Sequence, residues 1–206
     1  TLIASDNAAT RVLARTSDLL RRAGELTPYE LWLASEMRDD AIDALNDRMA
    51  LSLDAEERAF ARRLNEYRRV LGLRPFELEE RCNVSARKHS QEMVDLGYFG
   101  HISPVERNRT PSDRVRLEGY NGGVGENCLA GNTDGIGAFE GWYHSPGHHR
   151  NLISGGVHLG VGATSDHGMW TMVCGGNDGS WRGLHRDLPP ERRQELAEIA
   201  SRLAIA

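Results

Sequence analysis

Residues 141–152 read Gly-Trp-Tyr-His-Ser-Pro-Gly-His-His-Arg-Asn-Leu, and this stretch decides how the rest of the chain is interpreted. It holds three of the eight histidines of the protein. Pro146 and Gly147 separate the first of them from the other two, and a Pro-Gly pair ends a helix and exposes neighbouring side chains. The stretch therefore predicts the rim of a cleft that is lined by histidine.

The composition is that of a globular protein. Of the 206 residues, 39% are hydrophobic and 27% are charged, which suits one sizeable core or one core plus a small accessory domain. The formal net charge of -5 comes from acidic and basic residues mixed along the chain, so no basic stripe predicts a nucleic-acid partner. No run of roughly 18 apolar residues occurs, which predicts no membrane span.

The three cysteines, Cys82, Cys128 and Cys174, allow at most one internal disulfide. None has the close spacing of a zinc ribbon or a redox pair, so buried thiols are the simplest interpretation. If one disulfide forms, we expect Cys128 with Cys174, because both lie in predicted strands.

The hydrophobic pattern predicts three parts: a helical extension at residues 1–52, a main domain at 53–180, and a linker with a final helix at 181–206. The extension has two helices, the second starting at Thr27-Pro28 with the pattern of a capping box. They would pack on the main domain, cover its cleft or mediate dimerisation. The final helix carries a narrow apolar stripe of Leu196, Ile199 and Leu203, which needs a partner surface.

Within the main domain, helices are predicted to flank a small, mainly antiparallel sheet. A capping box starts a helix at Asp54, and another starts a short helix at Thr110. A further helix is predicted over 134–143, and strands are predicted over 124–130, 157–163 and 169–174, the last two forming a hairpin. Helical spacing also joins Leu78, Cys82, Ala86, His89 and Met93, which makes His89 a core histidine rather than a ligand.

Glu126 is an acidic residue on the apolar face of a predicted strand. Burying a carboxylate costs several kcal/mol unless a positive group, a metal ion or several donors meet it. Histidines are the economical candidates for that role. His144 and His148 are four residues apart, but Pro146 and Gly147 interrupt a shared helix face, and only one of His148 and its neighbour His149 is expected to face the cleft.

Five motifs in order resemble those of the CAP superfamily, which groups cysteine-rich secretory proteins, insect venom antigens and plant pathogenesis-related proteins. The resemblance is strongest to its bacterial branch, covers about residues 56–176, and rests on the motifs together, since each is weak alone. They are Asn65-x-x-Arg68 with Gly72-Leu73-Arg74-Pro75, Ala86-x-x-His89-Ser90-x-x-Met93, Gly100-His101, Gly125-Glu126-Asn127, and Trp142-x-x-Ser145-Pro146-Gly147-His148-His149-x-Asn151-Leu152.

The resemblance implies an α+β fold, a three-layer α-β-α sandwich with a central cavity lined by two histidines and two acids. Carried over by motif, His101, Glu126 and His148 line the cavity, and Ser145 stands where animal members have the second acid. In some members this tetrad binds zinc or another divalent ion, which implies His101 and His148 as metal ligands here. Because members are mostly secreted, the resemblance also implies an extracellular or cell-envelope location, although this chain contains no signal peptide.

Three functions follow as hypotheses. The first is an exported binding module for a small or lipid-like ligand or a divalent ion, since several eukaryotic members bind sterols or fatty acids. The second is a metal-assisted hydrolase of peptides or cell-envelope material, in which Glu126 and His148 would be the catalytic residues. The third is an interaction scaffold that binds a protein partner, or dimerises, through residues 1–50.

Overall fold

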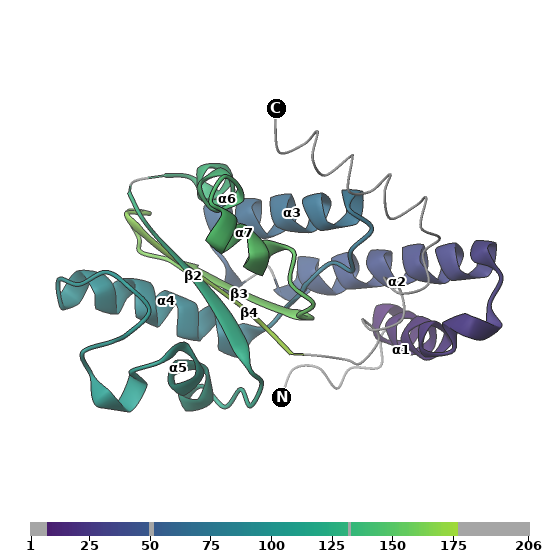
Figure 1. Cartoon of the computed structure of the whole chain (residues 1–206), viewed down its shortest axis with the longest axis horizontal. Helices are drawn as coiled ribbons and strands as arrows, with labels where there is room; N and C mark the ends of the chain where they lie inside the picture. The colour runs from purple at the N-terminus through teal and green to yellow at the C-terminus, as the bar shows by residue number, and fades with distance from the viewer. Residues whose placement is uncertain (1–7, 50–51, 132, 177–206) are drawn as a thin grey trace. The chain divides into compact units, whose positions relative to one another are not determined.

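A computed structural model describes residues 8–49, 52–131 and 133–176 of the chain (Figure 1). The helix predicted near the C-terminus, with its stripe of Leu196, Ile199 and Leu203, lies outside the described residues. The chain divides into two compact units: the first two helices belong to the first unit, and Met49–Gly176 form the second. The predicted division into 1–52, 53–180 and 181–206 remains a prediction.

The first unit contributes helices α1 (Ala8–Arg21) and α2 (Pro28–Met49), joined through the short 3₁₀ helix η1 (Ala23–Glu25). The start of α2 is capped as the sequence predicts: the Glu30 carboxylate accepts from the Thr27 amide at 2.8 Å, and the Thr27 hydroxyl accepts from the Glu30 amide at 3.3 Å. Among the described helices, none combines the length and the hydropathy that a membrane crossing requires.

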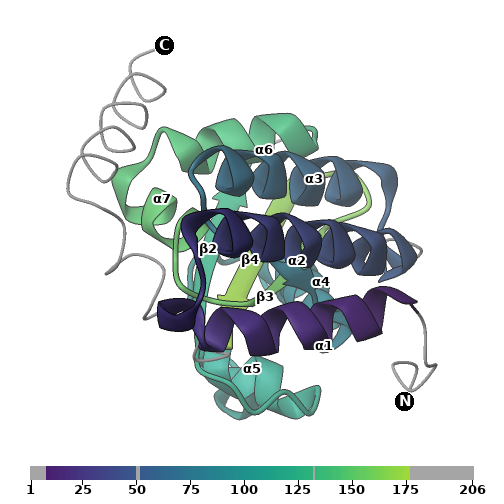
Figure 2. The same ribbon diagram turned by 90° about the vertical axis from the view of Figure 1, so that its right-hand side faces the viewer.

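The second unit is the predicted sandwich of helices and one sheet. Its helices are α3 (Ala55–Val70), α4 (Glu80–Asp95), α5 (Pro111–Leu117), α6 (Gly135–Tyr143) and α7 (Pro146–Leu152), with a 3₁₀ helix η3 (Glu106–Asn108). Its strands are β1 (Glu77–Leu78), β2 (Val124–Ala130), β3 (His158–Ala163) and β4 (Met169–Gly175). Helices α4 and α5 cover one face of the sheet, whereas α3, α6 and α7 lie on the other (Figures 1 and 2).

The four strands have the order β1-β3-β4-β2. β1 pairs with β3 in parallel, and the other neighbours are antiparallel. β2 is therefore an edge strand, aligned so that Glu126 faces Val173 and Cys128 faces Thr171 of β4. This edge is where side chains from both helical layers reach the same strand.

Local signals explain where the helices of this unit begin. The Asp54 side chain accepts from the Glu57 amide and the Glu57 side chain accepts from the Asp54 amide, which completes a capping box at α3. Thr110 and Asp113 form the same arrangement at α5. Helix α4 lies against β3 closely enough that a side chain in place of Gly162 would collide with the α4 backbone at Arg87.

The core between the sheet and the α3 layer is aromatic. Phe60 of α3 packs edge-on against Trp142 of α6, with ring centroids 5.1 Å apart, and also contacts Trp170 of β4. All three side chains are fully buried, so α6 is held firmly over the sheet. The Trp142 indole also donates to the carbonyl of Cys128 at 3.2 Å, which links α6 to the strand that carries Glu126.

Three expectations from the sequence are corrected. Leu78 lies in β1 and not in the following helix, which begins at Glu80. Pro146 does end one helix, but it also begins α7, since proline suits the first turn of a new helix.

The third correction concerns the disulfide expected between Cys128 and Cys174. The structure has no such bond, and both cysteines are free thiols. Cys128 lies opposite Thr171 in the ladder, and Thr171 bonds to Ser90 of α4. Cys174 is three residues beyond Thr171 and contacts Ser154 after α7. Side chains alternate between the faces of a strand, so the two thiols lie on opposite faces of the sheet.

Candidate functional site

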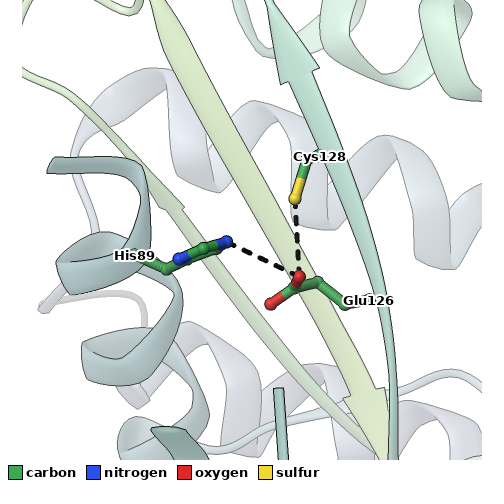
Figure 3. Close-up of side chains that lie close together, drawn as sticks. All are labelled: His89, Glu126 and Cys128. Atoms are coloured by element: carbon green, nitrogen blue, oxygen red, sulfur yellow. Dashed lines mark hydrogen bonds and ion pairs between the residues drawn. The ribbon is translucent and has the colours of Figure 1, made fainter. Parts of the chain in front are cut away.

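The centre of the candidate site is the carboxylate of Glu126. Glu126 and Cys128 lie two residues apart on β2, and both side chains extend toward α4 (Figure 3). Only 2% of the Glu126 side chain is exposed. A buried carboxylate needs compensation, and the structure supplies it from three different elements.

Arg114 of α5 is the main partner of Glu126. Its Nη2 atom lies 2.9 Å from Oε1 and 2.7 Å from Oε2 of the carboxylate. The guanidinium is itself buried, and it also donates to the carbonyls of His101, Asn108 and Arg109 at 3.1 to 3.2 Å. Arg114 therefore neutralises Glu126 and ties the loop of His101 to α5.

Sequence reasoning missed Arg114. The burial of Glu126 predicts a positive group, a metal ion or several donors beside it, and histidines are the candidates named for that role. Arg114 lies in the first turns of the helix that the Thr110 capping box predicts, next to the buried Val115. An arginine next to an apolar position of a short helix was the signal that could have indicated a buried cation. Which carboxylate it pairs with depends on how α5 packs on β2.

His101 is the second partner of Glu126. Its Nδ1 atom lies 2.9 Å from Oε1, while 49% of the side chain remains exposed. Because a carboxylate only accepts, Nδ1 carries a proton and the Nε2 edge is left for other contacts. The hydrogen bond to Glu126 raises the pKa of His101, so the ring holds its proton to higher pH than an isolated histidine.

His148 enters the site from α7. Its Nδ1 atom lies 2.8 Å from the hydroxyl of Ser145, and its backbone carbonyl accepts from the Asn127 amide at 3.0 Å. Partial burial and the neighbouring positive charge of His101 lower the pKa of His148. His101 and Glu126 are thus in direct contact, the His148 backbone lies against Asn127 of β2, and the charge of His101 acts on the His148 ring. A shared cavity of His101, Glu126, Ser145 and His148 stays a prediction.

The charge state of Glu126 follows from opposing effects. Burial raises its pKa, but the hydrogen bond from His101 and the charge of Arg114 outweigh burial, so the net pKa lies below the ordinary value. Glu126 is therefore an anion at neutral pH with both oxygens occupied. A carboxylate in this state is a poor proton acceptor.

His89, Glu126 and Cys128 form a second cluster on the inner side of the carboxylate. Their potential ligand atoms lie within 4.8 Å of one another, which makes them the group in the described residues that has metal-like spacing. Cys128 donates to Glu126 Oε1 at 3.5 Å, and His89 Nε2 lies 3.7 Å from the same oxygen (Figure 3). Burial raises the pKa of the Cys128 thiol well above its usual range, and Arg114 already provides the cation, so the cluster fits a hydrogen-bond network better than a metal ion.

The other histidines of residues 141–152 lie away from this carboxylate. His144 is exposed and its Nε2 atom is 3.3 Å from Glu140. His149 Nε2 lies 2.8 Å from the Tyr67 hydroxyl, among the aromatic rings of α3 and α6. His149 is therefore held among these aromatic rings, whereas the charge of His101 acts on its neighbour His148.

With this geometry in place, comparison with known proteins identifies the domain. A model of the cysteine-rich secretory protein (CAP) family matches residues 61–175, which is more than half of the chain. The chain belongs to the CAP family. All four predicted cavity residues and Arg114 fall within the matched part of this CAP domain.

Two relatives come from Bacillus subtilis strain 168. The uncharacterized protein YkwD is 32% identical over 123 residues, which is 59% of this chain and 47% of that protein. The uncharacterized membrane protein YlbC is 35% identical over 94 residues, 44% of this chain and 26% of that protein. This CAP chain therefore spans less than half the length of either relative.

Solved structures agree with the fold. An extracellular protein containing an SCP domain from Bacillus anthracis is 25% identical with a TM-score of 0.54, covering 72% of this chain and 43% of that one. An outer surface protein from Borrelia burgdorferi is 17% identical with a TM-score of 0.53, covering 61% of this chain and 97% of that one. The second likeness establishes the fold alone.

Proposed function

We propose that this CAP domain is an exported binding module, and that its ligand is a small or lipid-like molecule with an acidic head group. The observation that carries the proposal is the pairing of Arg114 with Glu126, 2.7 Å apart and both buried. The two charges cancel, so the imidazoles of His101 and His148 determine the net charge that the site presents to a ligand.

The half-exposed edge of His101 is the group best placed to meet an anion. Its pKa is raised by Glu126, so the ring carries a positive charge over a wider pH range than that of His148. A hydrogen bond between an imidazolium and a carboxylate is about twice as strong as a neutral one. The site therefore favours a carboxylate or another compact anion.

Apolar residues on either side of His101 support a lipid-like ligand. Phe99 is 57% exposed and Ile102 is 55% exposed, although large apolar side chains are usually buried. Val105, a few residues further along the loop, is also exposed. A ligand with an acidic head at His101 would cover part of this apolar surface and gain about 25 cal/mol for each Å² removed from water.

An extracellular or cell-envelope location is part of the proposal. The Bacillus anthracis neighbour is described as extracellular, and it shares the fold at 25% identity. An exported module has access to lipids and envelope fragments that a binding site of this kind would take up.

Calorimetric titration with decanoate, in the presence of a chelator, tests the proposal. Decanol, which has the same chain without the charge, and acetate, which has the charge without the chain, should bind at least tenfold more weakly. His101→Ala should lower the affinity for decanoate about tenfold or more, because a charged hydrogen bond contributes about 1.5–3 kcal/mol. His144→Ala, which removes an exposed histidine outside the site, serves as the matched control. No binding of decanoate at millimolar concentration, or equal binding by the His101 and His144 variants, would refute the proposal.

A divalent metal ion is the second candidate ligand, and one observation favours it. Both imidazoles have Nδ1 in a hydrogen bond, to Glu126 in His101 and to Ser145 in His148, which leaves the Nε2 atoms as ligands. Metal-binding histidines typically have such a partner on the other nitrogen. A zinc ion held by His101 and His148 would supply a Lewis acid with open positions for water or substrate.

Glu126 does not fit this metal site as a third ligand. Arg114 occupies both of its oxygens, and an added cation would meet the guanidinium. Titration with zinc should therefore give weak binding that His101→Ala and His148→Ala each abolish, while His144→Ala leaves it unchanged. If neither site variant changes zinc uptake, the metal is bound elsewhere.

The hydrolase hypothesis has less support from the geometry. Its base would be Glu126, whose pKa is lowered and whose oxygens are both bonded. Ser145 lies 2.8 Å from His148, but these residues are three apart at the start of a helix, where such a bond is common. The scaffold hypothesis for residues 1–50 concerns the other unit and stays a prediction.

A further inference from the structure

His89 is a buried histidine that none of the functions above uses. It extends from the middle of α4, and its side chain is fully buried. Each ring nitrogen faces a carboxylate: Nε2 lies 3.7 Å from Glu126 Oε1, and Nδ1 lies 3.7 Å from Glu92 Oε2. These distances are too long for direct hydrogen bonds, so the function of the ring lies in other contacts.

The contact that matters is with the loop before His101. His89 Nε2 lies 3.1 Å from the carbonyl oxygen of Gly100. A carbonyl only accepts, so Nε2 carries the proton and donates it to the peptide that joins Gly100 to His101. Gly100 has a φ of 144°, a backbone conformation that favours glycine, and this turn directs its carbonyl inward to α4.

The opposite nitrogen of the His89 ring faces Tyr98. Nδ1 lies 3.3 Å from the Tyr98 hydroxyl, which donates at 2.6 Å to Glu92. Burial lowers the pKa of His89, against the opposing effect of the Glu126 carboxylate, so the ring is neutral at neutral pH with its one proton on Nε2. Because the Tyr98 proton goes to Glu92 and Nδ1 is unprotonated, the contact between Tyr98 and Nδ1 is packing and not a hydrogen bond. Burial and the hydrogen bond to Gly100 keep the ring in place.

The next backbone carbonyl along the chain, that of His101, is also held by a hydrogen bond. The carbonyl of His101 accepts from Arg114 at 3.1 Å, and the His101 ring donates to Glu126 at 2.9 Å. Helix α4 thus holds the peptide before His101, α5 holds the carbonyl of His101 itself, and β2 holds its side chain. A loop residue that is half exposed gains the fixed orientation of a residue on a rigid element.

We infer that His89 is a positioning residue for His101: its Nε2–H hydrogen bond to Gly100 sets the orientation in which His101 presents its outer edge to a ligand. The inference rests on the proposed function in one respect, namely that His101 contacts the ligand. His89 itself is buried behind Glu126 and touches no ligand.

Two substitutions of His89 separate this hydrogen bond from simple packing. In His89→Gln the side-chain amide nitrogen reaches about as far as Nε2 and keeps a donor for Gly100. In His89→Asn the amide nitrogen reaches only about as far as Nδ1, so the donor is lost. Both replacements are polar and smaller than the ring, which makes them matched in the damage they do to the core. Thermal unfolding of each variant reports that damage separately.

The main readout is the ¹⁵N spectrum of the His101 ring in the chelated full chain, which distinguishes the two neutral tautomers and the charged ring. Above the pKa of His101, the wild-type protein should show a single neutral tautomer with its proton on Nδ1. His89→Asn should move the His101 nitrogens toward an average of states and weaken decanoate binding about tenfold, a factor equivalent to about 1.4 kcal/mol. His89→Gln should restore both properties to within about twofold.

Gly100→Ala provides a second test that leaves α4 unchanged. Its positive φ is unfavourable for alanine, so the carbonyl should leave His89 and give the same spectral change as His89→Asn. This variant keeps the inference testable if His89→Asn does not fold. Unchanged His101 nitrogens in either folded variant, or equal losses in His89→Gln and His89→Asn, would overturn the inference. If the wild-type protein binds no decanoate, the proposed function fails, and the ring spectrum still decides the positioning role of His89.

Discussion

Replacing Arg114 by methionine should be among the most damaging single changes in the CAP domain. The substitution keeps a long apolar side chain but leaves Glu126, 2% exposed, with His101 as its remaining partner of opposite charge at hydrogen-bond distance. Removing one member of a buried ion pair typically costs about 3–5 kcal/mol. A domain of this size has a total stability of about 5–15 kcal/mol, so the loss is a large fraction of it.

The change in stability is measured by urea unfolding of Arg114→Met at neutral pH. The matched control is Arg116→Met in the same helix, which breaks a pair with Asp113 at 3.1 Å whose arginine side chain is 65% exposed. An exposed pair contributes about 0–1 kcal/mol, so this control should unfold almost like the wild-type protein. The double variant Arg114→Met with Glu126→Gln should lose less stability than Arg114→Met alone.

The loss of stability caused by Arg114→Met should depend on pH, in a direction set by the pKa of Glu126. In the wild-type domain Glu126 has a lowered pKa, so its contribution is present above the unfolded value and is lost as the pH falls through the folded value. Without Arg114, burial should raise the pKa of Glu126 above the unfolded value, and the variant should recover stability as acid protonates the carboxylate. The difference between wild type and variant should therefore shrink as the pH falls through the raised pKa of the variant and then through the lowered pKa of the wild type. A coupling energy between the two residues under about 0.5 kcal/mol, or a difference that does not change with pH, would refute the reasoning.

Three further predictions follow from the same structure. The wild-type domain should lose stability as the pH falls below the ordinary pKa of a glutamate, about 4.3, and on through the lowered pKa of folded Glu126, and acid unfolding followed by circular dichroism measures this. Cys82, Cys128 and Cys174 are buried and free, so a thiol reagent should label none of them in the folded domain and all three in urea. Residues 49–176 form a compact unit with its own core, and they should unfold cooperatively when expressed without the remainder of the chain; a broad, non-cooperative transition would contradict this.

Local chemistry made much of the fold predictable. The capping residues Asp54 and Thr110 bond to their own helices, so the start of each helix is visible in a few consecutive residues. The strand predicted over 124–130 has the same bounds in the structure, because alternation of apolar side chains is a property of the segment itself.

Elements that depend on distant partners could not be predicted in this way. β1 has two residues, and it exists because Glu77 and Leu78 pair with His158 and Leu159 of β3, far along the chain. The faces of the sheet that Cys128 and Cys174 occupy depend on strand register, which the sequence does not state.

The candidate site shows the same difference between residues that local motifs indicate and contacts that depend on distant partners. The motifs point to His101, Glu126 and His148, but no motif contains the pairing of Arg114 with Glu126. The nearest signal was the rule that a buried carboxylate needs a positive group. His89 is the reverse case: its helical spacing correctly indicated a buried residue, whereas its bond to Gly100 depends on how the loop folds back on α4.

Ser145, at the position where the resemblance to animal members implies a second acid, has a consistent physical meaning in this site. Two carboxylates beside two imidazoles would make an anionic pocket that attracts cations. Here a single carboxylate is cancelled by Arg114, and Ser145 offers a neutral partner to His148. The charge of the site then runs from zero to positive as the imidazoles take up protons, so acid conditions should favour anions and neutral conditions should favour metal ions. Titrating decanoate and zinc across the same pH range should therefore give affinities that change in opposite directions, and parallel changes would show that the imidazoles do not control the site.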